Sequence, residues 1–395
     1  MTRVLELSAQ AAGGVRAHIR QVSQLLAKDG HQVLLAGPSN VISPADDAVG
    51  GACLRTYQIN IGARPSGADL KALRQLKQLA ATAQVIHAHG LRAGALAVLA
   101  VKRLPAAKRP RVVVTLHNLP VGSAPTRLVG QALHLVVVKG ADYVLTVSPD
   151  LLEKAKQLGL KAGEIAVVPA PARGCADCRC MDSAAQSEIS QASAQSSHAG
   201  SGVGTGSGVG AGSSYGASSA AGSGATPCVL TIARLAPQKG LDLLLEAATL
   251  IKQRGLNFTW LVAGDGPLKA QLNQQIIAAD LPVKLLGRRE DIGALLAQAD
   301  VVVQTSYWEG QPLTLREAMQ AGRAIVATDV GGSAYTLAGC GQLVEPQAGP
   351  LADAVVAVIS DPKRRETLEA ASRAAVAKIP GETQLREQLD RVLAL

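Results

Sequence analysis

Aromatic side chains are scarce in this sequence of 395 residues, which holds one Phe, two Trp and five Tyr, 2% of the total. Hydrophobic residues nevertheless make up 48%. The core must therefore consist mainly of Ala, Val, Leu and Ile, and the chain is long enough for two domains that each bury a core. RNA-binding aromatic motifs and paired zinc-finger spacings are lacking, so nucleic acid is not an expected partner.

Long apolar runs and export features are lacking as well. The longest apolar stretches, such as residues 93–101 and 135–138, fall well short of the ~20 residues that cross a bilayer. The start of the sequence has no basic segment followed by a long apolar one, so we expect no secretory signal. Six cysteines in such a chain indicate reduced thiols rather than a disulfide framework. These features predict a cytoplasmic protein.

Charge of one sign is in excess, because the formal net charge is +9. This excess favours anionic partners such as nucleotide diphosphates or an acidic membrane surface. In residues 70–79, leucines recur at every third position, while Lys71, Arg74 and Lys77 share another face. A solvated surface helix explains this pattern. The alternative is electrostatic contact with an acidic acceptor or with anionic lipid, which would place the protein at the inner membrane face.

The N-terminal half alternates strand-like and helix-like segments. Residues 3–7 and 33–36 read as strands on either side of a helix at 15–27, which is a nucleotide-binding βαβ plan. Gly13 and Gly14 lie in the first loop, where they would let a ligand approach the backbone closely. A plain tight turn would use the same glycines without a ligand. Further strands with helix-length spacing predict a doubly wound parallel sheet.

Three histidines follow or end strands of this predicted sheet. His117 closes the strand at residues 111–116, at the carboxyl end where open α/β sheets bind ligands. It could orient a substrate hydroxyl or donate a hydrogen bond, or it could be an ordinary loop histidine bonded to the backbone. His87 and His89 have the i, i+2 spacing of two metal ligands on one strand face. The sequence shows no nearby carboxylate or cysteine to complete a metal site.

The segment at residues 183–226 is dominated by Ser, Gly and Ala. Such a segment cannot bury enough apolar surface to offset its ordering entropy, so we expect a disordered insertion. Its glycines do not match the G-x-G-x-x-G fingerprint of dinucleotide-binding loops. Cys175, Cys178 and Cys180 cluster just before it, but without a fourth ligand they do not predict a zinc site.

Two cations and a second glycine loop mark the C-terminal half. Arg234 and Lys239 lie between a strand at residues 228–233 and the next helix, where they could hold a diphosphate from two sides. Lys239 near a helix N-terminus is unfavourable unless an anion is bound. Gly264 and Gly266, in the loop AGDGP, would let the backbone approach a base or ribose.

A strand-to-helix turn later in the sequence carries two carboxylates. Glu309 lies just outside the helix and Glu317 one to two turns inside it. Both could accept hydrogen bonds from sugar or ribose hydroxyls. The amides of Gly310, Gln311 and Leu313, at the positive helix end, could face an anion. A capping carboxylate and a solvated helical Glu are the alternative interpretation.

These segments resemble a known family. RLAPQKG, VAGDGPL, LLGRRED and SYWEGQPLTLREAMQAGRAIVATDVGG, in this order, are similar to the C-terminal half of the retaining GT-B glycosyltransferases of family 4. GGVRAHIRQVSQLLAKDGHQVLLAG resembles their N-terminal half. The resemblance covers both halves and leaves out only the insertion. It implies an α/β fold in which two Rossmann-like, doubly wound parallel-sheet domains face a cleft.

The expected domains follow from this resemblance. Residues 1–172 would form the N-terminal, acceptor-side domain, and residues 173–227 the disordered insertion between the domains. Residues 228–375 would form the nucleotide-sugar-binding domain. The helical tail at 376–395 would cross back onto the N-terminal domain.

The resemblance also implies roles for single residues. Arg234 and Lys239 would neutralise the donor diphosphate, Glu309 would bind hydroxyls of the donor sugar, and His117 would lie near that sugar. The remaining residues would bind the donor: Gly13, Gly14, Gly264, Gly266, Gly310, Leu313 and Glu317. Gln311 departs from the family, which usually has an apolar residue there, so an altered sugar pocket is expected.

The predicted function is transfer of a sugar from a UDP-, GDP- or ADP-linked donor, with retention of configuration, to a glycan, lipid-linked or small-molecule acceptor. The family implies no cofactor and no required metal. One alternative is a nucleotide-sugar epimerase or hydrolase of the same fold. Another is a non-catalytic protein that binds sugar nucleotides.

Overall fold

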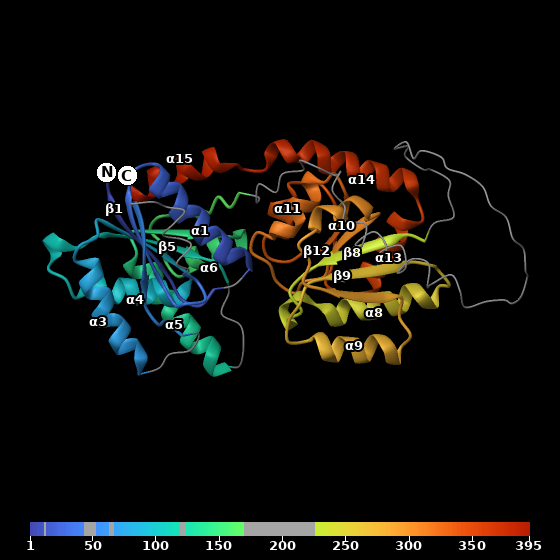
Figure 1. Cartoon of the computed structure of the whole chain (residues 1–395), viewed down its shortest axis with the longest axis horizontal. Coiled ribbons are helices and arrows are strands. Elements are labelled where there is room, and N and C mark those ends of the chain that lie inside the picture. The colour runs from blue at the N-terminus through green and yellow to red at the C-terminus, as the bar shows by residue number, and fades with distance from the viewer. Residues whose placement is uncertain (12, 43–52, 63–66, 119–123, 170–225) are drawn as a thin grey trace, which may run out of the picture.

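Two lobes, each built on one parallel sheet, make up the computed structural model of the protein (Figure 1). The structure describes residues 1–11, 13–42, 53–62, 67–118, 124–169 and 226–395. Nearly all of the predicted insertion at 173–227, with its three clustered cysteines, lies outside the described residues. The predicted pair of doubly wound parallel sheets is confirmed, because every strand pairing among the described residues is parallel.

The N-terminal lobe has seven strands in the order β3-β2-β1-β4-β5-β6-β7. The strands are β1 Arg3–Ser8, β2 Gln32–Gly37, β3 Leu54–Gln58, β4 Val85–His89, β5 Arg111–Leu116, β6 Tyr143–Thr146 and β7 Gly163–Ile165. The helices are α1 Gly13–Lys28, α3 Ala68–Ala80, α4 Leu91–Lys102, α5 Ala124–Gly140 and α6 Pro149–Gln157, with a 3-10 turn η2 at Ala106–Lys108. Chain order reverses beside β1, so the carboxyl ends of β1 and β4 form a switch point where such sheets bind ligands.

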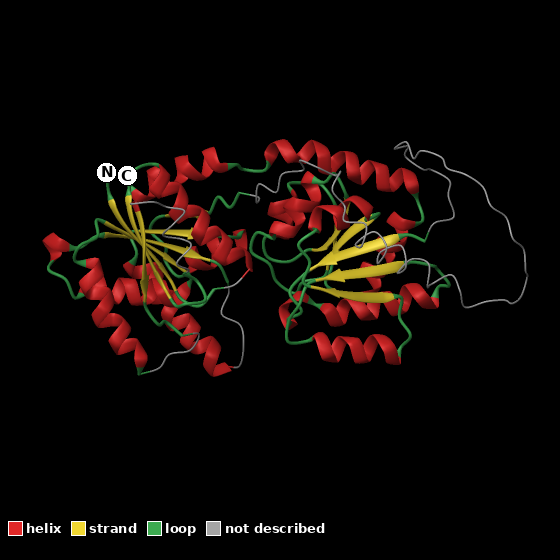
Figure 2. Cartoon of the chain, viewed as in Figure 1, coloured by secondary structure: helices red, strands yellow, loops and turns green. Residues whose placement is uncertain are grey.

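Helices cover both faces of this sheet because successive strand residues point to opposite sides (Figure 2). Leu5 and Leu7 of β1 pack in the core shared with α3 and α4. Val4 packs on the other face, in the core shared with α1 and α15 (Glu382–Leu393). A strand buried on both faces reads as a continuous apolar run, which is why these strands were predictable.

The C-terminal lobe has six strands in the order β10-β9-β8-β11-β12-β13. The strands are β8 Cys228–Ile232, β9 Thr259–Ala263, β10 Val283–Gly287, β11 Val301–Gln304, β12 Ala324–Thr328 and β13 Gln342–Val344. The helices are α8 Leu241–Gln253, α9 Lys269–Ala278, α10 Ile292–Gln298, α11 Leu313–Gln320, α12 Ser333–Leu337, α13 Ala348–Ile359 and α14 Pro362–Ala375, with 3-10 turns η3 Pro237–Lys239 and η4 Val376–Lys378.

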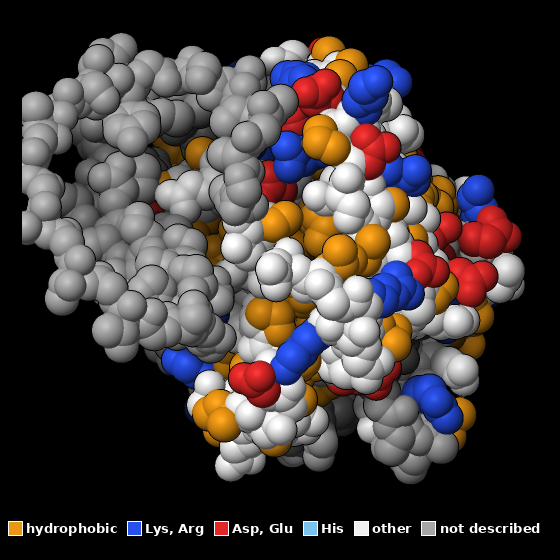
Figure 3. All heavy atoms as spheres, turned by 90° about the vertical axis from the view of Figure 1, so that its right-hand side faces the viewer, with side chains coloured by type: hydrophobic (Ala, Val, Ile, Leu, Met, Phe, Trp, Pro, Cys, Tyr) orange, Lys and Arg blue, Asp and Glu red, His pale blue; other side chains and the backbone are white. Residues whose placement is uncertain are grey.

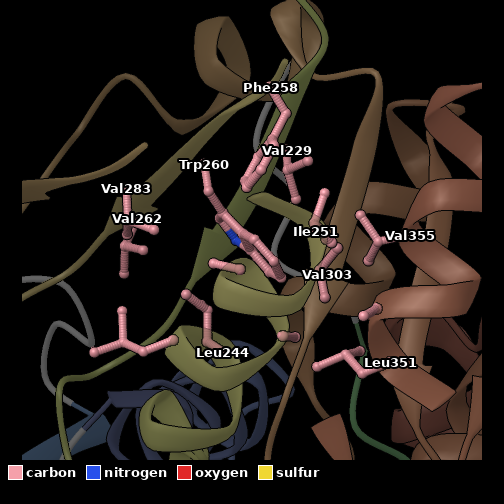
Figure 4. Packing of buried hydrophobic residues seen from close by; sticks show 14 of the residues in the cluster. Val229, Leu244, Ile251, Phe258, Trp260, Val262, Val283, Val303, Leu351 and Val355 are labelled. Atoms are coloured by element: carbon pink, nitrogen blue, oxygen red, sulfur yellow. The ribbon is translucent and has the colours of Figure 1, made fainter. Parts of the chain in front are cut away.

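Trp260 is the largest fully buried side chain of this lobe (Figure 4). It lies on β9, in a core otherwise made almost entirely of aliphatic side chains from the sheet, α8 and α13. The indole Nε1–H donates a 3.0 Å hydrogen bond to Thr231 Oγ1, so burial leaves no polar group of the ring unpaired.

Helix α15 leaves the C-terminal lobe and packs on the N-terminal sheet (Figure 1). Leu385 and Leu389 are buried in the N-terminal core. Gln388 accepts a 2.7 Å hydrogen bond from the Val167 amide through Oε1, and Arg111 Nε donates to the Val392 carbonyl at 2.9 Å. The last helix therefore joins the two lobes.

Helix α3 buries a different set of residues from the one that the sequence predicted. The predicted leucine stripe on α3 is wrong in part, because Leu70 is 66% exposed and the buried positions are Ala72, Leu76 and Ala80. Burial repeats every fourth residue there, as helix geometry requires, rather than every third. Lys71, Arg74 and Lys77 are exposed, as both interpretations of that face require.

None of the helices in the described ranges is long and apolar enough to cross a membrane. On the outer face of the C-terminal lobe, acidic and basic side chains are interspersed (Figure 3). The net positive charge is therefore not concentrated on that face.

Replacing Trp260 by Ala tests whether this ring organises the C-terminal core. The substitution leaves a cavity and should lower the free energy of unfolding by ~3–5 kcal/mol. Urea unfolding followed by circular dichroism measures the change. Ile277→Ala on α9 is the control, because Ile277 is 69% exposed and its truncation should change stability by less than ~0.5 kcal/mol. Equal effects of the two changes would contradict this assignment.

Candidate active site

Loops at the carboxyl ends of the two sheets touch each other. A Cβ added to Gly14, at the start of α1, would lie 3.1 Å from Leu313 Cδ1 at the start of α11. A Cβ added to Gly310 would lie 2.5 Å from Val147 Cγ2 and 3.6 Å from the His117 carbonyl oxygen. The structure thus brings Gly14 and His117 of one lobe next to Gly310 and Leu313 of the other.

An ion pair between Lys239 and Glu309 lies at this junction. Lys239 Nζ is 2.5 Å from Glu309 Oε1, and Ser306 Oγ donates a hydrogen bond to the same oxygen, also at 2.5 Å. The Lys239 side chain is 22% exposed and that of Glu309 11%. The anion that Lys239 was predicted to need beside a helix N-terminus is, in this structure, the Glu309 carboxylate. Both side chains of the pair are therefore partly open to solvent.

Backbone contacts fix both partners of this pair. Gly240 follows Lys239 in the left-handed conformation, with φ +59°, and any side chain there would overlap the Thr305 carbonyl oxygen. Thr305 Oγ1 in turn donates to the Lys239 carbonyl at 2.8 Å. On the other side, the Gly332 amide donates to the Glu309 carbonyl at 2.9 Å. The loops after β8, β11 and β12 are therefore interlocked.

Gly264 and Gly266 lie where the loop after β9 crosses the loop after β8. A side chain at Gly264 would overlap the Ala233 carbonyl oxygen, and one at Gly266 the Leu235 carbonyl oxygen. This close approach of two backbones explains both glycines without a ligand. Their predicted contact with the donor nucleotide stays a prediction.

The other predicted residues occupy the same edge of the C-terminal sheet. Arg234 follows β8 and is exposed, and it pairs with no carboxylate in the described part of the chain. Glu317 lies on α11 and is only 8% exposed. On the N-terminal side, Gly13 is exposed with φ +57°, and a Cβ there would meet nothing within 4 Å. Arg234 and Gly13 are thus accessible to a ligand.

Gln311 joins the two lobes. Its Nε2 donates to the Ala166 carbonyl at 2.6 Å, and its Oε1 accepts from Arg316 Nη2 at 2.5 Å. A second bond between the lobes runs from Trp308 Nε1 to Asp150 Oδ2 at 2.8 Å. In the structure, the Gln311 amide is thus hydrogen-bonded to the opposite lobe and to Arg316. The expected alteration of the sugar pocket by Gln311 stays a prediction.

Arg316, on helix α11, is an arginine buried in the protein interior. It is 2% exposed, and its Nε and Nη1 have no hydrogen-bond partner among the residues that the structure describes. Burial lowers the pKa of its guanidinium to about 10, so it remains charged at neutral pH. Among the described residues, Gln311 is the one hydrogen-bond acceptor of this guanidinium. The buried Arg316 guanidinium is therefore hydrogen-bonded by Gln311, the same side chain that bonds to Ala166 of the other lobe.

A cluster of buried histidines surrounds Glu6 beneath the junction. Glu6 Oε1 is 3.1 Å from His87 Nδ1, and Glu6 Oε2 is 2.7 Å from His89 Nε2. The sequence-based conclusion that no carboxylate lies near His87 and His89 was wrong. Parallel pairing of β1 with β4 places Glu6 opposite His87, 81 positions away in the sequence. These three residues lie close enough to share a cation.

The cluster continues to His117 and His18. His89 Nδ1 is 3.3 Å from His117 Nε2, and the rings of His18 and His117 lie 5.9 Å apart, edge to face. Burial is the main cause that lowers the pKa of His18 to about 3, of His89 to about 4, and of His117 well below its usual range. These rings are therefore neutral at physiological pH.

Sequence reasoning missed three contributors to this site: Glu6, His18 and Arg316. Glu6 stands in the apolar strand RVLELS, and a charged residue inside a doubly buried strand was the available signal. His18 and Arg316 occupy helix positions where polar residues commonly face water. Nothing in the local sequence marks them as buried.

Comparison with known proteins identifies the family. Residues 13–171 match the family described as "Glycosyl transferase 4-like domain", and residues 226–361 match "Glycosyl transferases group 1". Together these matches leave out only residues 1–12, 172–225 and 362–395. The chain belongs to the group 1 glycosyltransferases, family 4, of the GT-B fold.

Individual members of this family align with only part of the chain. The chain is 33% identical to an alpha-D-kanosaminyltransferase of Streptomyces kanamyceticus over 149 residues, 36% of this chain and 39% of that protein. It is 41% identical to a Campylobacter jejuni N,N'-diacetylbacillosaminyl-diphospho-undecaprenol alpha-1,3-N-acetylgalactosaminyltransferase over 108 residues, 27% of each chain. The chain thus matches less than two fifths of the length of these relatives.

Solved structures match over the whole chain. Anabaena Alr3699/HepE, crystallised with UDP and glucose, superimposes with a TM-score of 0.72 at 20% identity and covers 100% of both chains. Sucrose-phosphate synthase of Thermosynechococcus elongatus gives a TM-score of 0.71 at 18% identity, covering 100% of this chain and 98% of that one. At these identities the likeness establishes the GT-B fold.

A double-mutant cycle tests whether Gln311 and Arg316 act as a unit. Gln311→Leu leaves a buried cation and the Ala166 carbonyl without this partner, and should cost ~1–3 kcal/mol of stability. Adding Arg316→Leu removes the buried guanidinium that has lost its partner. The double variant should therefore be no less stable than the single variant Gln311→Leu. Urea unfolding should then show a coupling energy of at least ~1 kcal/mol. Strictly additive effects would contradict the pairing.

The histidine cluster predicts how stability depends on pH. Buried His18, His89 and His117 have folded-state pKa values below the value of 6.5 for an unperturbed imidazole. Between pH 6.5 and about 4 the unfolded chain therefore binds more protons, and the free energy of unfolding should fall as pH falls. Urea unfolding at pH 7.5 and 5 measures this fall. It should be smaller in His18→Leu, and an unchanged slope would show that His18 is not buried neutral.

Proposed function

We propose that this protein transfers a sugar from a nucleoside diphosphate donor to an acceptor hydroxyl. The observation that carries the proposal is the Lys239–Glu309 ion pair at the junction of the two lobes. A cation for the diphosphate and a carboxylate for sugar hydroxyls lie side by side and partly open to solvent. Family membership and the resemblance of the flanking segments support this use of the pair.

In this proposal Lys239 and Arg234 act on the leaving group. The bond between the anomeric carbon and the diphosphate oxygen breaks, and negative charge grows on the departing nucleoside diphosphate. The two cations and the amides at the start of α11 stabilise that charge. Released from Lys239 when the diphosphate binds, Glu309 accepts hydrogen bonds from the sugar. No metal is required, because these cations and amides neutralise the charge.

Retention of configuration is part of the proposal. It requires the acceptor oxygen to attack the anomeric carbon from the face that the diphosphate leaves. A new bond to the acceptor oxygen forms there, and the acceptor proton leaves with the nucleoside diphosphate. The N-terminal lobe, through Gly14 and His117, supplies the opposite wall of the site. Glu317 would hold the ribose, with Gly264 and Gly266 beside the base.

For the donor and the acceptor we propose substrate classes only. The Anabaena protein was crystallised with UDP and with UDP-glucose, so a UDP-linked hexose is the first donor to test, followed by GDP- and ADP-linked sugars. Relatives are named for transfer to diphospho-undecaprenol-linked sugars and to 2-deoxystreptamine. A lipid-linked glycan is the first acceptor to test, with a small molecule as the second.

Ligand-dependent thermal stability tests the role of the ion pair. A UDP-, GDP- or ADP-sugar, or its free diphosphate, at a hundred times its dissociation constant should add ~2.7 kcal/mol of stability. Lys239→Ala should weaken binding of the free diphosphate at least tenfold, about 1.4 kcal/mol. Glu309→Gln should bind it at least as tightly as the wild type, because Lys239 then loses its competing carboxylate.

Lys252→Ala provides the matched control for that experiment. Lys252 lies on α8 of the same lobe and pairs with Asp280 in an exposed contact 3.0 Å long. Its removal should leave binding unchanged. Absence of any shift with every nucleotide would contradict the proposal. Consumption of the sugar nucleotide without an acceptor would favour an epimerase or hydrolase. Binding of the sugar nucleotide without turnover on any acceptor would favour a non-catalytic sugar-nucleotide-binding protein.

A further inference from the structure

A continuous line of buried polar groups runs from Glu6 to His117. Glu6 Oε2 is 2.7 Å from His89 Nε2, and His89 Nδ1 is 3.3 Å from His117 Nε2. Glu6 is 0% exposed, His89 2% and His117 6%. The line crosses from β1 through the end of β4 to the residue after β5. It therefore connects the interior of the sheet to the edge that faces Gly310.

The protons along this line can be assigned from its buried end. Burial alone would raise the pKa of Glu6, but the His87 ring and hydrogen bonds from His87 and His89 lower it to about 2. An ionised carboxylate only accepts hydrogen bonds, so His89 must carry its proton on Nε2. Because burial keeps the His89 ring neutral, its Nδ1 carries a lone pair and no proton. His117 must then donate through Nε2.

We propose that Glu6 and His89 are positioning residues that hold His117 as a neutral imidazole with its proton on Nε2 and a lone pair on Nδ1. Nδ1 is then the ring atom left for a ligand, and it can only accept a hydrogen bond. A sugar hydroxyl satisfies it, whereas a carboxylate or phosphate oxygen would face a lone pair. This recognition rests on the proposed function, in which His117 lies beside the donor sugar.

A divalent cation is the competing explanation for part of this cluster. The ligand atoms of Glu6, His87 and His89 all lie within 4.8 Å of one another. Each of them already has a hydrogen-bond partner inside the cluster, and His87 Nε2 is bonded to Thr115 Oγ1 at 2.8 Å. Hydrogen bonds therefore account for the arrangement without a metal.

Nitrogen NMR of the full chain decides between these accounts. Histidine labelled with ¹⁵N gives long-range proton correlations that distinguish the two neutral tautomers and the charged ring, and no donor or turnover is needed. At pH 5 to 8, His89 and His117 should both appear as the neutral Nε2–H form. A charged ring or an Nδ1–H tautomer at His117 overturns the proposal, as does one zinc per chain by elemental analysis.

Two substitutions on opposite sides of Glu6 show which arm sets the tautomer. Glu6→Leu removes the acceptor for His89, so an Nδ1–H form of His117 should appear. Thr115→Val removes a group of the same buried cluster on the His87 arm, and the His117 signals should not change. Retention of the Nε2–H form in Glu6→Leu overturns the role of Glu6, and if that variant fails to fold, the wild-type spectrum still decides.

This result is independent of the donor experiment. A chain that binds no nucleotide but shows the expected tautomers would contradict the proposed function alone. A chain that binds a nucleotide through Lys239 but carries His117 as Nδ1–H would contradict the positioning role alone.

Discussion

The ion pair between Lys239 and Glu309 is the interaction on which the site depends. It joins the loop after β8 to the loop after β11, and Ser306 bonds the same carboxylate oxygen. The interlocked backbone around Gly240 and Gly332 holds both partners in place. A partly exposed pair of this kind contributes little stability by itself. In the proposed function, the pair holds two opposite charges at one place, where a bound diphosphate would displace the carboxylate.

Around this pair, polar side chains and helix α15 join the two lobes. Gln311 reaches the Ala166 carbonyl, Trp308 reaches Asp150, and α15 returns to the N-terminal sheet. Below the junction, Glu6, His87 and His89 form a buried cluster in which the charged carboxylate and both rings are hydrogen-bonded. Buried polar groups are costly unless they are all satisfied, so such a cluster specifies one arrangement of side chains. It places His117 at the edge of the site.

Much of the fold was predictable because doubly buried parallel strands and alternating helices leave a strong pattern in the sequence. The placement of Lys239 and Glu309 in loops after strands, and of Glu317 inside the helix that follows, came from that pattern. Contacts between distant segments did not, since register decides them: Glu6 meets His87 only because β1 pairs with β4. Gln311 and Arg316 were equally hidden, because the sequence does not show which helix face meets the other lobe. The sequence marked Gly264 and Gly266 as residues that would let a ligand approach. The structure adds a second reason for them, because the backbone of the loop after β8 passes too close to allow a side chain at either position.

The most direct test of the central claim is a crystal structure of the full chain with the nucleoside diphosphate that binds best. The account predicts that Lys239 Nζ leaves Glu309 Oε1 and contacts a phosphate oxygen, while Glu309 turns toward the space of the donor sugar. A diphosphate bound elsewhere, with the Lys239–Glu309 pair intact, would contradict the account.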